Sequence, residues 1–219
     1  MPSLRSIIAV TALLANGIHA HFTVQLPPTV GAFKDDDEGD APCGGYSPDL
    51  STINTSDFHV KGDAIATTST HPRTNWLYRI TIDSTPTGNW TQIHEIIQQT
   101  GAGQYCTPDV TVPSEYVGKK AILSIVASGP DGLLYQCSAV NFVDGTASIS
   151  DGCTNSSSVT GSPTTDDALT ALVGTNVSST TTASETPNTA MILRESSVNG
   201  LGSLLTAGLM IVVGFVLAM

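Results

Sequence analysis

One histidine could carry metal chemistry in this chain, because of where the chain is expected to be cut. Residues 1–20 contain a positive charge at Arg5, an apolar run over 7–15 and a small residue, Ala20, a pattern typical of a secretory signal peptide. A buried N-terminal helix is the disfavoured alternative. Cleavage after Ala20 would make His21 the new N-terminus, and its free amine and ring Nδ1 could then chelate one metal ion.

A second imidazole would complete three nitrogen ligands in a T, a geometry that suits Cu(II). Both imidazoles must be neutral and the amine must lose its proton, so binding should weaken in acid. Three further histidines follow the expected cut: His59, His71 and His94. His71 precedes Pro72, which favours an extended or turn conformation at an end of the predicted sheet. From the residues alone, each of the three also has an ordinary strand or surface role as its simpler interpretation.

The elements that must hold these histidines are predicted to be mostly β-strands. Apolar residues alternate with polar ones, or form short apolar runs, over 22–26, 76–82, 121–127 and 133–142. Gly129, Pro130, Asp131 and Gly132 separate the last two ranges, which predicts a hairpin. Residues 91–100 are compatible with either a helix or a strand. Short strands with Gly/Pro turns indicate an all-β, immunoglobulin-like or fibronectin-like sandwich.

Four cysteines behind a signal peptide predict disulfide bonds, and the sequence does not choose among the three possible pairings. They are Cys43, Cys106, Cys137 and Cys153. Acceptor motifs for N-linked glycans are also present, which predicts surface positions in a secreted protein. They start at Asn54, Asn89, Asn155 and Asn176.

Changes in composition divide the chain into four parts. After the signal peptide at 1–20, residues 21–153 form the predicted folded domain, and 154–188 form a Ser/Thr-rich stalk. Residues 189–219 end in an uncharged apolar tail and resemble a signal for a GPI lipid anchor. Asn188 is the predicted attachment site, with Ser196 or Ser197 as the alternative. A transmembrane helix is the competing interpretation of the tail, although it lacks the usual basic flank.

The formal net charge of −11 disfavours nucleic acid and other anionic partners. An acidic run over 35–40 contributes to this charge. It lacks the glycine and glutamate positions of a calcium-binding EF-hand loop, so we expect a solvated loop that attracts cations weakly.

Several motifs together resemble the fungal copper acquisition factor family, whose domain is related in fold to lytic polysaccharide monooxygenases. The most specific are the start His21-Phe22-Thr23-Val24-Gln25-Leu26-Pro27-Pro28 and the segment Tyr135-Gln136-Cys137. Cys43-Gly44-Gly45, Ser69-Thr70-His71-Pro72 and Gly103-Gln104-Tyr105-Cys106 also match. The resemblance covers nearly the whole chain, including the stalk and the anchor signal.

This resemblance implies an extracellular, lipid-anchored copper-binding protein with a histidine brace formed by His21 and His71. It also implies that polysaccharides are not oxidised. Together, His21, His71 and the anchor favour copper capture at the fungal cell surface, with a copper transporter or reductase as partner. The family also places an aspartate near the copper, at the position occupied here by Ala139. Asp131 is expected to be only a turn residue.

Two other functions are compatible with the same residues. A copper-dependent polysaccharide monooxygenase would use the same brace to activate oxygen, but usually has a tyrosine at the axial position, where this chain has Ala139. A non-catalytic cell-wall protein with a degenerate copper site is the third possibility, and Ala139 favours it somewhat.

Overall fold

Ten strands, a 3₁₀ helix and a short α-helix make up the part of the chain that this computed structural model describes, residues 21–148 and 151–174. The strands are β1 (Phe22–Leu26), β2 (Ser56–His59), β3 (Asp63–Ser69), β4 (Arg73–Thr81), β5 (Thr91–Gln92), β6 (Ile97–Thr100), β7 (Gly103–Val110), β8 (Lys120–Gly129), β9 (Gly132–Val143) and β10 (Thr160–Pro163). The helices are the 3₁₀ turn η1 (Ser114–Tyr116) and α1 (Asp167–Thr170).

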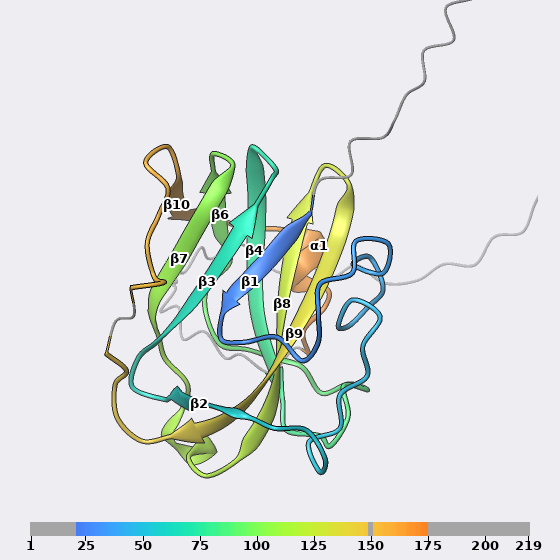
Figure 1. Cartoon of the computed structure of the whole chain (residues 1–219), viewed down its shortest axis with the longest axis vertical. Helices are drawn as coiled ribbons and strands as arrows, with labels where there is room; N and C mark the ends of the chain where they lie inside the picture. The colour runs from blue at the N-terminus through green and yellow to red at the C-terminus, as the bar shows by residue number, and fades with distance from the viewer. Residues whose placement is uncertain (1–20, 149–150, 175–219) are drawn as a thin grey trace, which may run out of the picture. The chain divides into compact units, whose positions relative to one another are not determined.

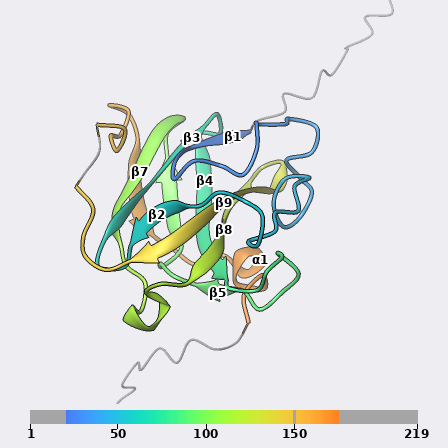
Figure 2. The same cartoon turned by 60° about the horizontal axis from the view of Figure 1, so that its bottom comes forward.

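The strands form two sheets that pack as a sandwich (Figures 1 and 2). The smaller sheet has the order β1-β3-β7, so β1 is an edge strand. The larger sheet has the order β10-β6-β4-β8-β9-β2, and β5 pairs with β4. Neighbours are antiparallel except β2 and β9, which run parallel. The all-β sandwich expected from the sequence is confirmed.

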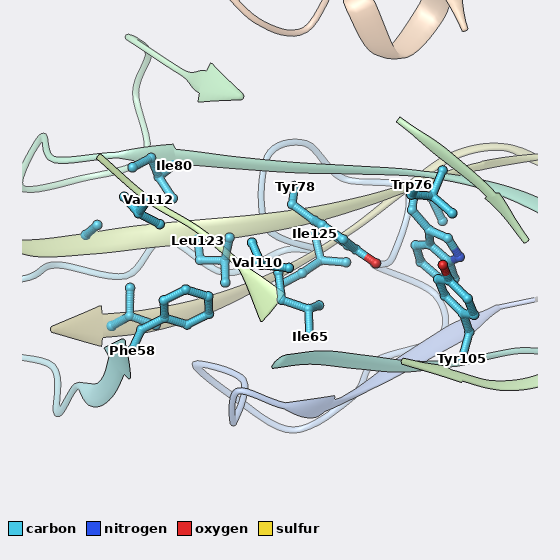
Figure 3. Packing of buried hydrophobic residues seen from close by; sticks show 14 of the residues in the cluster. Phe58, Ile65, Trp76, Tyr78, Ile80, Tyr105, Val110, Val112, Leu123 and Ile125 are labelled. Atoms are coloured by element: carbon cyan, nitrogen blue, oxygen red, sulfur yellow. The ribbon is translucent and has the colours of Figure 1, made fainter. Parts of the chain in front are cut away.

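Aromatic and branched apolar side chains fill the space between the two sheets (Figure 3). The ring of Phe22, from the first residue of β1, meets the buried Trp76 of β4 edge-on, with ring centroids 5.1 Å apart. Trp76 also donates a hydrogen bond from Nε1 to Gln99, 3.0 Å away. The core therefore fixes the residue that follows His21.

The predicted hairpin is confirmed, and its turn lies at the same end of the sandwich as the start of β1. Strands β8 and β9 pair up to Gly129 and Gly132, on either side of the turn. The start of β1, the β3–β4 turn and the β8–β9 turn all lie at the upper end in Figure 1. At 91–100, where the sequence left helix and strand open, the structure forms β5 and β6.

Two disulfides tie the domain together, Cys43–Cys137 and Cys106–Cys153. The first joins the long loop after β1 to β9. The second joins β7 to the segment that precedes β10. The predicted disulfide bonds are thus present, and the structure supplies the pairing that the sequence left open.

Folded structure continues beyond residue 153, where the sequence analysis placed the start of the stalk. Strand β10 pairs with β6, and Asp166 caps α1 by accepting a hydrogen bond from the backbone of Leu169. Leu169 is fully buried and belongs to one apolar cluster with Leu77 and Val126 of the larger sheet. These two side chains belong to this separate cluster rather than to the core between the sheets, so the C-terminal segment keeps them from water.

Some of the expected features lie outside the described residues. These are the signal peptide over 1–20, Asn176, Asn188 and the apolar tail. Among the residues that are described, no helix is long and apolar enough to cross a membrane.

Candidate metal centre

His21 is held against the end of β3 by Thr70, its neighbour across the sheet. Phe22 pairs with Ser69, and the backbone nitrogen of Thr70 donates to the carbonyl oxygen of His21 at 3.1 Å. The His21 nitrogen in turn lies 3.0 Å from Oγ1 of Thr70. In the uncleaved chain this nitrogen is a peptide amide, whereas after cleavage it is an amine that can bind a metal ion.

The His21 imidazole turns its Nδ1 atom toward a carboxylate pair. Nδ1 lies 3.1 Å from Oδ1 of Asp35, within ion-pair distance, yet this buried atom makes no hydrogen bond of acceptable geometry to any described residue. Ligand atoms of His21, Asp35 and Glu38 lie within 4.8 Å of one another. The exposed ring of Phe33 flanks the imidazole, with centroids 5.4 Å apart. Nδ1 is thus a sheltered donor atom available to a cation.

Glu38 is a buried member of the loop that the sequence predicted to be solvated. It is 2% exposed, and its Oε1 accepts hydrogen bonds from the backbone of Phe22 at 3.1 Å and from Nε2 of Gln136 at 3.3 Å. Burial raises the pKa of Glu38 to about 7; the two hydrogen bonds oppose this rise, and the negative charge of Asp35 adds to it. The prediction of a solvated loop is therefore wrong for this residue.

His71 is buried in the turn between β3 and β4. It is 2% exposed, and its backbone nitrogen donates to Oγ of Ser69 at 3.1 Å. Its ring lies against Gly129, where a β-carbon would come within 3.2 Å of Nε2. Nε2 lies 3.2 Å from Oδ2 of Asp131 in the β8–β9 turn. The absence of a side chain at Gly129 therefore lets the ring approach this turn closely.

The two expected brace residues lie at the same end of the sandwich: His21 contacts Thr70, and His71 is the next residue of the chain after Thr70. Among the described residues, the group of three or more close side-chain donors contains His21 but not His71. A brace also uses the main-chain nitrogen of His21, which is not a side-chain donor. The structure thus brings the two residues to one end of the fold, each with its own carboxylate neighbour.

Ala139, at the position where the resemblance implied an aspartate, is far along β9 from the turn. It pairs with Ile122, is 4% exposed and packs in a cluster with the Cys43–Cys137 disulfide. The carboxylate that lies beside His71 is instead Asp131, which the sequence analysis expected to be only a turn residue. This contact was not visible in the sequence, because a Pro-Asp-Gly turn explains the residue by itself.

The other two histidines lie elsewhere. His59 is in β2, beside the last residues of β9, and its Nδ1 is 3.0 Å from Oδ2 of Asp63. His94 contacts the carbonyl oxygen of Glu95 through Nδ1 at 2.9 Å. Neither residue belongs to the donor group at His21.

Three of the four predicted glycan acceptors can be located. Asn54 and Asn89 are exposed, and Asn89 donates a hydrogen bond to Asp83 at 2.8 Å. Asn155 is exposed as a residue, but its Oδ1 accepts a hydrogen bond from the backbone of Cys106 at 2.8 Å. The side chain of Asn155 thus also stabilises the segment that follows the second disulfide.

Comparison with known proteins gives a family match over the folded domain. The profile of the family described as "Copper acquisition factor BIM1-like" matches residues 19–158. No curated protein matches the chain. The family match covers both candidate histidines, His21 and His71, together with all four cysteines.

Proposed function

Because the chain belongs to the BIM1-like copper acquisition factor family, we propose that it captures Cu(II) outside the cell through His21 and His71. Three nitrogens would bind the ion: the His21 amine freed by cleavage after Ala20, the His21 ring Nδ1 and the His71 ring Nε2. Nitrogen donors in a T suit Cu(II), which prefers tetragonal geometry. Copper is the cargo in this function, so the site must both bind and release it.

The observation that carries the proposal is the pair of contacts between His21 and Thr70, the residue that precedes His71. Two backbone atoms of His21 contact Thr70, at 3.0 and 3.1 Å. These contacts keep the future amine near the β3–β4 turn. The buried Nδ1 of His21, which makes no hydrogen bond to a described residue, is a second donor ready for a metal.

Carboxylates beside both rings fit the same function. Asp35 lies 3.1 Å from the His21 Nδ1, and Asp131 lies 3.2 Å from the His71 Nε2. Negative oxygens near a bound dication stabilise it, and more strongly where water is partly excluded. We therefore assign the fourth position of the copper site, an oxygen ligand, to Asp131. It would replace the aspartate that the family has at the position of Ala139.

Capture at the cell surface requires a site that other molecules can reach. The side chain of His21 is 33% exposed and that of Asp35 is 53% exposed, so one side of the site is open to exchange. The predicted signal peptide and the predicted lipid-anchor signal support an extracellular, membrane-anchored location. A copper transporter or reductase at the plasma membrane is the partner that this location favours, and the proposed role is non-catalytic.

A calorimetric Cu(II) titration, combined with electron paramagnetic resonance, tests the proposal. The secreted protein must first be shown by mass spectrometry to begin at His21. We expect one tight site with coupling to three nitrogens, lost in His71→Ala and kept in His94→Ala. Weak or multiple binding by the correctly processed protein would contradict the proposal. Oxidation of glucan or chitin with a reductant would favour the monooxygenase alternative.

A further inference from the structure

The backbone of Phe22, the residue that follows His21, is held from outside its own sheet. Because β1 is an edge strand, the nitrogen and oxygen of Phe22 have no strand partner on that side. The nitrogen donates to Oε1 of Glu38 at 3.1 Å, and the oxygen accepts from Nε2 of Gln136. Two side chains thus replace a neighbouring strand at the first residue of β1.

The two side chains are themselves fixed. The backbone oxygen of Glu38 accepts a hydrogen bond from the nitrogen of Tyr135 in β9, at 2.8 Å. Gln136, the next residue of β9, also donates to Oε1 of Glu38 at 3.3 Å. Glu38, Gln136 and the Phe22 peptide therefore form a closed set of hydrogen bonds, which we call the Phe22 clamp.

Chain ends fray unless they are tied down, and cleavage would place a chain end at His21, directly before the clamp. Fraying would separate the His21 amine from the imidazole of His71. Chelation by the two histidines would then be lost, because it requires both of them in one geometry. The Thr70 contacts hold His21 from the β3 side, and the Phe22 clamp holds the next peptide from the opposite side. The N-terminus is thus restrained from both sides.

We propose that Glu38 is the positioning residue of the copper site, and that it acts through the Phe22 clamp to hold the His21 amine and ring ready for chelation. This inference rests on the proposed copper function. Glu38 is suited to the role because its buried carboxylate oxygen accepts two hydrogen bonds. A shorter or apolar side chain could not accept them. Groups that orient metal ligands in this way typically contribute about 10- to 100-fold to metal affinity.

Variants of the full-length secreted protein, confirmed to begin at His21, test the role of Glu38. Glu38→Ala removes the clamp, Glu38→Gln keeps an oxygen acceptor without the charge, and Asp36→Ala removes the same charge from an exposed residue of the same loop. We expect Glu38→Ala to weaken Cu(II) binding about 10- to 100-fold and to change the nitrogen coupling in its paramagnetic resonance spectrum. Glu38→Gln and Asp36→Ala should keep the wild-type affinity and spectrum.

A measurement without copper separates this inference from the copper function itself. Hydrogen exchange at the Phe22 amide, followed by nuclear magnetic resonance, should be faster in Glu38→Ala than in wild type and unchanged in Glu38→Gln. If Glu38→Ala does not fold, Gln136→Ala removes the other half of the clamp and should give the same two effects. Wild-type exchange and wild-type copper binding in these alanine variants would overturn the inference. Faster exchange in a protein whose wild type binds no copper would instead refute the copper function.

Discussion

The Nε2 atom of His71 lies 3.2 Å from Oδ2 of Asp131, across the turn that joins β8 and β9. This contact joins the β3–β4 turn, where the chain crosses from the smaller to the larger sheet, to the turn that closes the β8–β9 hairpin. The ring is buried, whereas the aspartate side chain is 37% exposed. The carboxylate of Asp131 therefore contacts the buried imidazole of His71 and is also accessible to solvent.

Replacing Asp131 should change copper binding, whereas restoring an aspartate at position 139 should not. We expect Asp131→Asn to weaken Cu(II) binding and to alter the paramagnetic resonance spectrum, because one negative oxygen beside His71 is lost. Ala139→Asp would place a carboxyl in a buried cluster far along β9, so it should lower the free energy of unfolding without tightening binding. Equilibrium competition with a copper chelator measures both variants. A tighter site in Ala139→Asp would contradict this assignment.

A single residue left in front of His21 should abolish the tight site. An added alanine turns the amine of His21 into a peptide amide, whose nitrogen binds Cu(II) only after losing its own proton. The new chain end can chelate Cu(II) without the ring of His71, so we expect weaker binding, a changed nitrogen coupling that no longer depends on His71, and an unchanged thermal midpoint. The comparison uses two preparations that differ only by that alanine, checked by mass spectrometry. Equal copper affinity in both would show that the amine is not a ligand.

The sequence predicted the fold well because its strong signals are local. Alternation over 22–26 and the Gly-Pro-Asp-Gly turn between two apolar runs each depend on neighbouring residues, and both were confirmed as β1 and the β8–β9 hairpin. The residues around His21 depend instead on contacts between distant segments. Glu38 lies within an acidic run that looks solvated, and only the docking of its loop on β9 reveals its burial.

The amino-acid composition also did not indicate how far the folded domain extends. Residues after Cys153 are rich in Ser and Thr, which favoured a stalk, yet Leu169 is fully buried. One signal was available: Leu77 is an apolar residue on the otherwise polar outer face of β4, so its side chain needs cover. Nothing in the sequence indicated which segment would supply that cover.

Removing the Leu169 side chain should therefore destabilise the domain. Leu169→Ala leaves a cavity beside Leu77 and Val126, and such substitutions in a core typically cost about 2–5 kcal/mol in the free energy of unfolding. Thr165→Ala, at an exposed residue of the same segment, is the control and should stay within about 0.5 kcal/mol of wild type. Denaturant unfolding measures both. An equal, small effect in the two variants would mean that this segment does not cover the sheet in solution.

Stability of the copper-free protein should fall as the pH rises from about 5 to 7, and Glu38 should cause part of that fall. Its pKa is raised from 4.5 to about 7 in the folded protein, chiefly by burial, with Asp35 and His21 as its ionisable neighbours. Between these values the folded state holds a proton that the unfolded state has released, so lower pH favours folding. The thermal midpoint, measured with a chelator present, should therefore be higher at pH 5 than at pH 7.5. Glu38→Gln cannot titrate and should show a smaller difference between the two midpoints. The control Asp36→Asn should behave like wild type. Identical pH profiles for wild type and Glu38→Gln would contradict a raised pKa at Glu38.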